Sequence, residues 1–255
     1  MKEIYEVIDS RICDVQLIDQ PCYTTNLDLS IVSKNSKYGL MYNALEERNA
    51  ELIVPCEYDN IYFTELWLNT YCIAILNGKS GLFKLLSCQK EDIVTAIAEQ
   101  IVPCIYERIE NCYPYHLLYD RKTVQWYNHD TGKISAKYDR VVPIGDQYLL
   151  YTLGNRTSIW DHLNSKFVFN IPENCQIAEL GYHDKYAVFK LFHTEDKTEQ
   201  LLFCCIDSGK IRLSHKAENI IVYFKHGDVQ DIIGIQMSWG NMNETLNENI
   251  IDMIT

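Results

Sequence analysis

An internal repeat is the feature of this sequence that most limits its fold, because a chain built from copies of one short unit must stack those copies or arrange them in a ring. Leu52–Ile61 and Gln100–Ile109 share Ile-Val-Pro-Cys, then a tyrosine, an acid and a final isoleucine, 48 positions apart. Ile134–Val141 is an eroded third copy, 32 positions after the second when the tyrosines are aligned. The unequal spacing indicates that insertions lie between structural elements.

A second short element with one large side chain precedes these copies and recurs beyond them. The aligned large residues are 42, 43, 34 and 43 positions apart, at Met41, Phe83, Trp126, Trp160 and Phe203. Several of these elements follow another apolar run, as in Tyr71–Leu76, Tyr115–Tyr119, Gln147–Tyr151 and Tyr186–Leu191. Each unit is therefore predicted to be a strand, a turn, a strand, a turn and a strand.

Turn chemistry favours strands over most of the chain. Asn77-Gly78 is a strong hairpin signal, because it supplies the positive φ of a type I′ turn, and the runs between turns are rich in Val, Ile, Tyr, Phe and Thr. Two stretches have helical spacing instead, Lys90–Gln100 and Glu244–Ile254. The segment Leu86–Glu99 is the largest irregularity between matched elements, and we expect a loop or short helix there.

The pairing of a Gly-Leu-aromatic strand with a following Ile-Val-Pro-x-x-Tyr-Asp strand resembles the WG-repeat, or KWG-repeat, proteins of bacteria. The likeness extends from about Ile31 to Val142. The chain departs from that pattern at the Trp before Gly, which is Tyr38 in the first unit and Ser80 in the second, and its later units lose the Gly and the Pro. The resemblance, to a diverged member, implies an interaction module and supplies no catalytic residues.

The repeat length points to a particular architecture. About 43 residues with three or four short strands is the size of a propeller blade, and 255 residues hold roughly six such units. We predict an all-β fold, a repeat of short antiparallel strand units in a β-propeller of about five to six blades; the alternative is an open β-hairpin solenoid. Residues 1–255 are expected to form a single repeat domain, with 1–29 as an N-terminal cap or blade-completing segment, 30–240 as repeats and 241–255 as a C-terminal tail.

Composition and charge exclude several classes of partner. The chain is 47% hydrophobic, as in folded proteins, and its 35 acidic against 23 basic residues give a net charge of −12. That sign opposes binding to phosphate backbones or anionic lipid, so we expect no nucleic acid and no membrane as partner. The acidic N-terminus lacks the basic start of a signal peptide, and no run approaches the ~18 apolar residues of a membrane helix. We expect a cytoplasmic protein.

Ten cysteines are numerous enough that their spacing must decide between thiols, disulfides and metal. No pair has the two-residue gap of a zinc ribbon or a redox motif, and most lie in apolar runs. Adjacent Cys204 and Cys205 would point to opposite faces of a strand. Buried free thiols are therefore expected over a disulfide framework, and a Cys–His site assembled by the fold stays open.

Signatures of catalysis and of cofactor binding are missing. Gly78-Lys79-Ser80 looks like the end of a phosphate-binding loop, but Ile73 stands where that motif needs glycine, and the histidines are scattered singly. We predict no catalytic residues, no cofactor, no metal site and no enzymatic activity. The tyrosine–acid pairs at 58–59, 106–107 and 138–139 are predicted to be structural, with the tyrosine in the core and the acid in water or capping a turn.

Residues that interrupt the repeat are the better candidates for binding, because insertions on one face of a repeat protein often form its binding surface. Aromatic side chains anchor protein interfaces, and four of them stand in such segments: Trp67, Tyr113, Tyr115 and Trp239. In a repeat protein each of the four could equally belong to the core.

The leading hypothesis is a non-catalytic protein–protein interaction scaffold of a bacterial cell. It would bind a partner protein, for which the acidic charge favours a basic one, through loops or one face of a β-repeat ring. One specific version is an inhibitor or immunity protein that neutralises a basic toxin or nuclease. The alternatives from other classes are a hydrolase or lyase with a dispersed site in a propeller channel, and a sensor of small ligands or carbohydrate.

Overall fold

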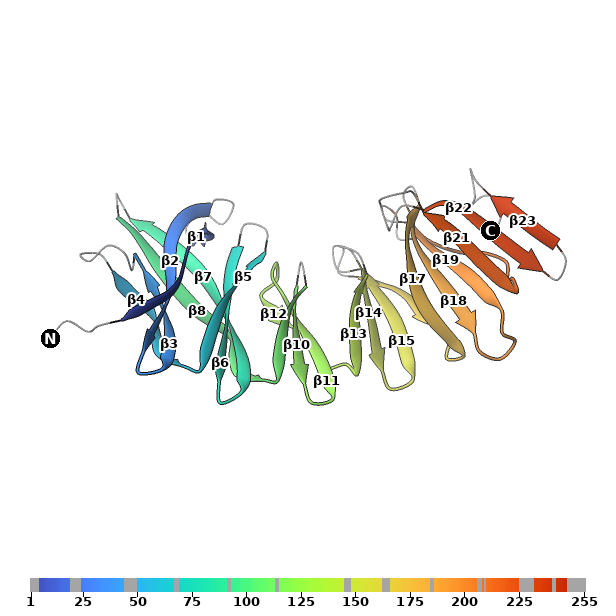
Figure 1. The fold of residues 1–255 in the computed structure, drawn as a ribbon. Coiled ribbons are helices and arrows are strands. Elements are labelled where there is room, and N and C mark those ends of the chain that lie inside the picture. Colours follow the sequence, from blue (N-terminus) through green and yellow to red (C-terminus); the bar gives the residue numbers. More distant parts are fainter. Residues whose placement is uncertain are drawn as a thin grey trace. The chain divides into compact units, whose positions relative to one another are not determined.

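The computed structural model describes residues 5–18, 24–43, 50–66, 69–90, 93–112, 115–144, 148–161, 166–183, 186–205, 208, 210–224, 232–239 and 242–246. The described residues form 23 strands and no helix, which confirms the all-β prediction. Consecutive strands pair antiparallel in six groups, called meanders 1 to 6. Figure 1 shows each meander as a run of neighbouring arrows, from blue at the N-terminus to red at the C-terminus.

The chain divides into two compact parts, an N-terminal half, Met1–Lys137, and a C-terminal half, Tyr138–Thr255. The N-terminal half holds meander 1, with β1 (Glu6–Leu17), β2 (Thr24–Lys34), β3 (Lys37–Tyr42) and β4 (Glu51–Tyr58); meander 2, with β5 (Asn60–Leu66), β6 (Asn69–Leu76), β7 (Lys79–Lys90) and β8 (Ile93–Tyr106); and meander 3, with β9 (Arg108–Cys112), β10 (Tyr115–Asp120), β11 (Thr123–Asn128) and β12 (Lys133–Ile134). A two-residue parallel pairing of β1 with β7 joins meanders 1 and 2 into one eight-stranded sheet.

The C-terminal half holds meander 4, with β13 (Arg140–Ile144), β14 (Tyr148–Leu153), β15 (Arg156–Asp161) and β16 (Lys166–Ile171); meander 5, with β17 (Cys175–His183), β18 (Tyr186–His193), β19 (Glu199–Cys205) and β20 (Ile211–Leu213); and meander 6, with β21 (Asn219–Phe224), β22 (Ile232–Trp239) and β23 (Met242–Leu246). Each of these three meanders is a sheet of its own.

The expected helix at Lys90–Gln100 is wrong, and so is the loop or short helix expected at Leu86–Glu99. β7 and β8 instead form one long hairpin that closes between Lys90 and Ile93. Burial alternates along β8, with Ala96 buried and its neighbours Thr95 and Ile97 exposed. A period of two thus overrides the helical spacing of the apolar residues, because the neighbouring strand offers both a ladder and a buried face. In the predicted C-terminal helix, Glu244–Leu246 belong to β23 and the rest lies outside the described residues.

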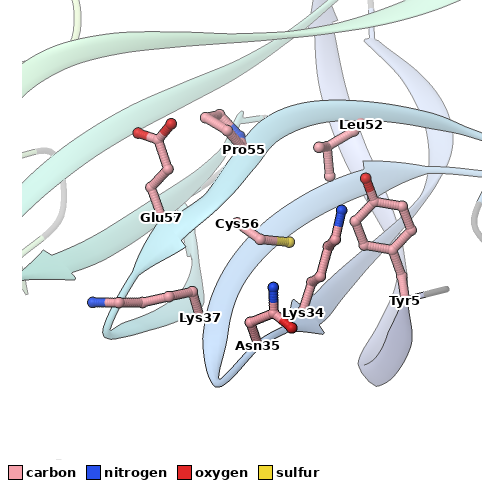
Figure 2. Close-up of a pocket in the computed structure, with 8 residues that line it drawn as sticks. All are labelled: Tyr5, Lys34, Asn35, Lys37, Leu52, Pro55, Cys56 and Glu57. Atoms are coloured by element: carbon pink, nitrogen blue, oxygen red, sulfur yellow. The ribbon is translucent and has the colours of Figure 1, made fainter. Parts of the chain in front are cut away.

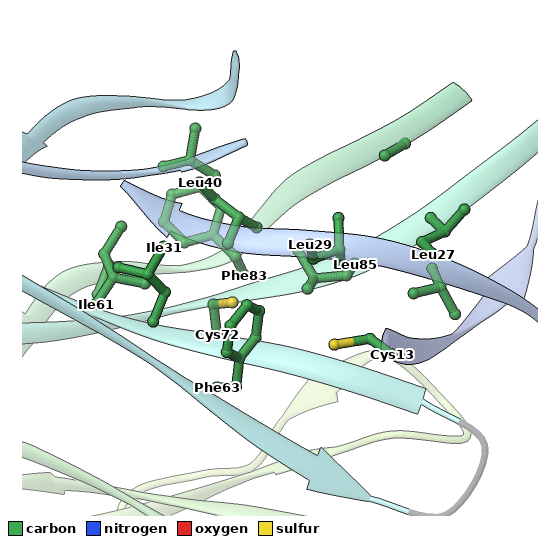
Figure 3. Packing of buried hydrophobic residues seen from close by; sticks show 14 of the residues in the cluster. Cys13, Leu27, Leu29, Ile31, Leu40, Ile61, Phe63, Cys72, Phe83 and Leu85 are labelled. Carbon is green, nitrogen blue, oxygen red and sulfur yellow. The ribbon is translucent and has the colours of Figure 1, made fainter. Parts of the chain in front are cut away.

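The central strands of several meanders are buried on both faces, which explains their continuous apolar sequence. In β6, Cys72 and Ala74 belong to a core shared by meanders 1 and 2, and Tyr71 and Ile73 belong to a core shared with meander 3. The first of these cores gathers Leu29, Leu40, Phe63, Phe83 and Leu85 between the strands (Figure 3). In the C-terminal half, β18 and β19 likewise divide their side chains between the core with meander 4 and the core with meander 6.

The repeated Gly and Cys of the first two units contact one another across neighbouring strands. A Cβ at Gly39 would stand 2.9 Å from the sulfur of Cys56, and one at Gly81 would stand 2.6 Å from that of Cys104. Each thiol also reaches a backbone carbonyl, at 3.8 Å for Cys56 and 3.6 Å for Cys104. The bare glycine makes room for the cysteine, so the two residues recur together.

In meanders 3 and 5, a glutamine and a serine replace the glycine–cysteine contact between neighbouring strands. Gln125 and Gln200 take the register position of Gly81, and their Nε2 atoms donate to the carbonyls of Ser135 and Ser214 at 2.7 and 2.6 Å. Each serine Oγ accepts from the amide of the residue after the glutamine, at 2.9 Å in both meanders. In meanders 3 and 5, a glutamine–serine contact between strands therefore replaces the glycine–cysteine contact.

The acid of the repeat immediately precedes the first strand of meanders 2, 3, 4 and 6. It stands two residues before a buried Ile or Val, and its amide donates to a carbonyl of the second strand of the meander, in Asp59, Glu107, Asp139 and Glu218. Asp59 Oδ2 accepts the amide of Asn77 and Asp139 Oδ2 that of Gly154, both at 2.6 Å, so these two carboxylates cap the next hairpin turn. The prediction that the acid caps a turn is confirmed at these two positions.

Nine of the ten cysteines are described, and all nine are free thiols, as expected. Cys13, Cys72, Cys204 and Cys205 are buried, and the other described cysteines are half-buried. Burial raises the pKa of the Cys204 thiol to about 12, and the nearby Asp161 carboxylate adds to the rise. Such thiols act as small apolar side chains.

Candidate functional site

The first half of β1 is more open to solvent than the central strands. From Glu6 to Ile12 its side chains are exposed or half-exposed without alternation. Val7, Ile8 and Ile12 are 41%, 50% and 76% exposed. Aliphatic side chains that stand in water along a strand form a surface that a partner can cover.

One edge of this strand also lacks a partner among the described residues. β1 pairs with β2 along its length and with β7 only at Gln16 and Leu17, and the Thr70 hydroxyl donates to the Asp14 carbonyl at 2.8 Å. The described strands therefore leave the other edge of β1 without a strand partner over residues 6–12. The outer strands β4 and β8 carry Pro55 and Pro103, which cannot donate a hydrogen bond, whereas β1 has no proline. An unpaired edge with apolar side chains is what an extended peptide needs to add a strand.

The charges along β1 are mostly acidic. Glu6, Asp9 and Asp14 stand on this strand with one cation, Arg11. Arg11 pairs with Asp9 at 2.9 Å and also lies over the Phe63 ring, 5.4 Å from its centroid. This surface therefore complements a basic segment.

A hollow of about 400 Å³ adjoins the start of β1. Figure 2 shows Tyr5, Lys34 and Leu52 together at one end of it and Lys37 and Glu57 at the other. Lys34 Nζ lies 5.4 Å from the centroid of the Tyr5 ring, and Lys37 pairs with Asp59 at 2.5 Å. The hollow thus combines an aromatic ring, aliphatic surface and charges of both signs beside the open strand.

The four residues predicted to bind a partner are not brought together in the described structure. Trp67 and Tyr113 lie outside the described residues, and so does the side chain of Trp239, whose backbone ends β22. Tyr115 is 1% exposed and meets Trp126 edge to face, with ring centroids 6.3 Å apart. Its ring belongs to the interior of meander 3, because the first residue of β10 faces inward.

A buried cluster in the N-terminal half was not predicted from sequence. His116 Nδ1 lies 3.1 Å from His129 Nε2, and His129 Nδ1 lies 2.5 Å from the Tyr71 hydroxyl. His116 is fully buried, and its Nε2 has no hydrogen-bond partner among the described residues. The three rings come from β6, β10 and the turn after β11, so this contact links meanders 2 and 3.

Burial makes the cluster uncharged at neutral pH. Desolvation, with the His129 ring adjoining, lowers the pKa of His116 to about 3. Desolvation and the Lys84 ammonium lower the pKa of His129 to about 4. Burial also raises the pKa of Tyr71, so all three groups are neutral and serve packing.

The C-terminal half places a cysteine, a histidine and a glutamine in contact. Cys175 Sγ lies 3.1 Å from His193 Nδ1, and His193 Nε2 lies 3.1 Å from Gln200 Oε1. Cys175 and His193 are register partners of β17 and β18, and Gln200 stands on the adjoining β19. All three residues are half-buried, and they lie at one end of the same sheet.

A hollow of about 490 Å³ adjoins this cysteine. Arg140, Val142 and Leu150 line it from meander 4, with Cys175 and Ile177 from meander 5. One sequence signal could have located it: Cys175-Gln176-Ile177 aligns with Asp59-Asn60-Ile61 and its other copies, so a cysteine replaces the acid of the repeat. The fading of the repeat beyond Val142 hid that alignment.

The described residues contain no group of three or more His, Cys, Asp or Glu side chains placed to hold a metal ion. Within the same part of the chain, no helix has the length and apolar character needed to cross a membrane.

No family model matches the sequence, and no curated protein is similar to it in sequence. The solved structures that match the chain include the extracellular domain of a putative one-component system from B. thetaiotaomicron, at 13% identity and a TM-score of 0.26. The match covers 96% of this chain and 34% of that chain, so this chain spans about a third of its length. A TM-score of that size relates neither the two folds nor their functions.

Proposed function

We propose that the protein is a non-catalytic interaction scaffold that binds a partner protein at β1. The observation that carries the proposal is the exposed first half of this strand, with Ile8 and Ile12 in water and the edge from residue 6 to residue 12 without a strand partner in the described structure. Main-chain hydrogen bonds to such an edge give affinity, and alternate side chains give specificity.

The partner segment is extended and basic. An extended segment can pair with the edge of β1 over residues 6–12, and basic side chains complement Glu6, Asp9 and Asp14. The net charge of −12 acts in the same direction at longer range, because it speeds the approach of a cation-rich protein. An inhibitor or immunity protein that neutralises a basic toxin or nuclease is the specific form of this function.

The rest of the chain supplies the rigid support. We propose that the chain is a cytoplasmic, diverged WG-repeat protein of a bacterium. Its meanders would close into a propeller or, in the alternative, stack as an open solenoid. Meander cores shared with both neighbours within each half suit either arrangement. Small-angle scattering separates the two, because an open stack has a larger radius of gyration than a ring of the same mass.

Affinity purification of the tagged full chain from its native cells tests the function. Wild type is expected to elute with one stoichiometric basic protein, identified by mass spectrometry and counted by light scattering. The double variant Ile8→Lys/Ile12→Lys is expected to lose it, because two cations replace apolar contacts on an acidic strand. Hydrogen exchange of the complex should show new protection of the β1 amides.

Leu153→Lys is the matched control. Leu153 is 57% exposed on β14, a strand that pairs on both edges, so this variant should keep the partner. A wild-type protein that elutes alone, or a partner that survives the double β1 variant, would contradict the proposal.

A further inference from the structure

One meander departs from the others at the acid of the repeat. Asp59, Glu107, Asp139 and Glu218 each stand two residues before a buried Ile or Val, and Cys175 stands two residues before Ile177. Across the ladder from Cys175 is His193. A thiol and an imidazole therefore occupy positions where the other meanders place a structural carboxylate and its neighbour.

The turn between β18 and β19 explains why meander 5 folds without an acid at the position of Cys175. Asp59 and Asp139 cap the hairpin turn after the next strand, whereas the β18–β19 connection is closed by its own Asp196. Asp196 Oδ1 accepts from the Thr198 amide at 3.1 Å and from the Thr198 hydroxyl at 2.6 Å. The Asn174 carbonyl accepts from the Thr194 amide and hydroxyl at 2.8 and 3.0 Å, and the Cys175 thiol contacts His193 rather than the turn residues 194–198.

A chain of hydrogen bonds sets the imidazole for proton transfer. Gln200 Nε2 donates to the carbonyl of Ser214 at 2.6 Å, which turns Oε1 toward His193. The His193 Nε2–H donates to that Oε1, so the lone pair of the neutral ring is on Nδ1, 3.1 Å from the Cys175 sulfur. Nucleophile, base and orienting amide thus stand in the order that nucleophilic catalysis requires.

The thiol needs that base. Burial raises the pKa of Cys175, and the carboxylates of Asp196 and Glu195 add to the rise against the opposing Lys216 ammonium. The sulfur is therefore protonated at neutral pH, and it becomes a strong nucleophile only when Nδ1 takes its proton.

The adjoining hollow indicates what the sulfur would meet. Arg140 lines it and has no ion-pair or hydrogen-bond partner among the described residues, although the chain as a whole is acidic. Val142, Leu150 and Ile177 supply apolar wall. A guanidinium beside an apolar wall suits a small molecule that carries a carboxylate.

We propose that Cys175 is a nucleophile, with His193 as its general base and Gln200 as a positioning residue, and that the hollow admits a small electrophile bearing a carboxylate that Arg140 binds. In the reaction the sulfur forms a bond to the electrophilic carbon, the leaving group departs with its electron pair, and the thiol proton moves to His193 Nδ1. The step forms a covalent adduct on Cys175, and it is a property of meander 5 separate from the non-catalytic partner binding proposed at β1.

Alkylation of the folded full chain tests the proposal, with iodoacetate as the anionic probe and iodoacetamide as the neutral one. Iodide is the leaving group in both, and peptide mass spectrometry follows each cysteine. Cys175 is expected to react faster than the half-buried Cys56 and Cys104, whose thiols reach backbone carbonyls. Its ratio of iodoacetate to iodoacetamide rate should exceed theirs about fivefold.

Variants separate the three roles. His193→Gln should slow Cys175 about 100-fold toward both probes. Arg140→Gln should slow only iodoacetate. Gln200→Met should slow both and, in the imidazole nitrogen spectrum, replace the single Nε2–H form of His193 with a mixture of tautomers. Faster labelling of buried Cys204 in any variant would reveal unfolding, so a folded variant is recognised within the same experiment.

Two results would overturn the proposal. One is a Cys175 rate equal to those of Cys56 and Cys104 in the wild type. The other is a folded His193→Gln protein whose Cys175 rate is unchanged. Loss of anion preference in Arg140→Gln with the iodoacetamide rate kept would confirm the carboxylate subsite, and an unchanged preference would remove Arg140 from it.

Discussion

Meanders 4 and 5 use one repeat position in different ways. In meander 4, Asp139 immediately precedes the first strand, and its carboxylate accepts a hydrogen bond from the amide of Gly154, whose φ is 60° in the tight turn. In meander 5 the same position is Cys175, and the corresponding turn is closed by Asp196 within its own loop. A repeat position can carry a reactive side chain when another residue caps the turn that this position caps in the other meanders.

The same contrast separates two kinds of histidine. His116 and His129 are buried between meanders 2 and 3 and contact each other and Tyr71. His193 is only half-buried and contacts the thiol of Cys175, which lines a hollow. Burial keeps His116 and His129 uncharged at neutral pH, whereas His193 lies next to the proposed nucleophile.

The largest effect is expected from acid on the buried pair. Their pKa values, about 3 and about 4, lie below the ordinary value near 6.5, so the unfolded chain binds protons that the folded chain does not. The free energy of unfolding should therefore fall as pH drops from 6.5 toward 4, by about 1.4 kcal/mol per pH unit for each histidine.

Urea unfolding, with hydrogen exchange read on β10 and β11, measures this slope. His129→Gln should reduce it, and His215→Gln, at an exposed position, should leave it unchanged. A wild-type stability in β10 and β11 that is flat from pH 6.5 to 4.5 would contradict the assigned neutral pair.

The next largest effect is expected at the glycine–cysteine contact. A Cβ at Gly81 would lie 2.8 Å from the Val102 carbonyl as well as against the Cys104 sulfur, so Gly81→Ala should cost about 3 kcal/mol. Gly78→Ala is the control. Its Cβ would meet nothing within 4 Å, and only its φ of 71° opposes the change, so about 1 kcal/mol is expected. Equal costs in urea unfolding would contradict the contact.

A smaller effect is expected from removing the cap. Asp139→Ala leaves the Gly154 amide to water and should lower the free energy of unfolding by about 0.5–1 kcal/mol. Glu173→Ala, at an exposed turn residue of the same half, should change it by less. Thermal melts of the two variants compare them directly, and equal shifts would mean that the cap stabilises nothing.

The smallest effect is expected at Cys175. Cys175→Ser should change stability by about 0.5 kcal/mol or less, because the turn beside it is closed without it. Cys204→Ser places a hydroxyl in a fully buried site and should cost about 1–3 kcal/mol. If the two substitutions cost the same in chemical unfolding, Cys175 is a structural thiol after all.

Sequence predicted the strands well where side-chain chemistry recurs. The Ile-Val-Pro-Cys copies and the Asn77-Gly78 turn predicted β4, β7 and β8, because proline, glycine and cysteine each have one steric role there. The prediction was wrong for residues 90–100, where apolar residues fit both a helical and a strand period. Pairing with β7 decided between them, and pairing is not encoded in that segment alone.

The candidate sites were harder to predict. Cys175, His193 and Gln200 are spread over 26 residues, and only the ladders of β17, β18 and β19 bring them together. Tyr115 was predicted to bind, but aromatic chemistry alone does not distinguish an anchor from a core ring, and its position at 1% exposure is set by meander packing. Cys175 is in register with the repeated acid, but this alignment becomes visible only from the strand pairing in the structure.

A reactivity map of the native cysteines shows whether Cys175, at the position of the repeated acid, is a reactive thiol and not a structural one. The full chain is pulsed with N-ethylmaleimide at neutral pH, and each thiol is read by mass spectrometry. Cys175 is expected to label first, Cys56 and Cys104 next, and the buried thiols last, which are Cys13, Cys72, Cys204 and Cys205. Labelling of Cys56 or Cys104 as fast as Cys175 would contradict this expectation.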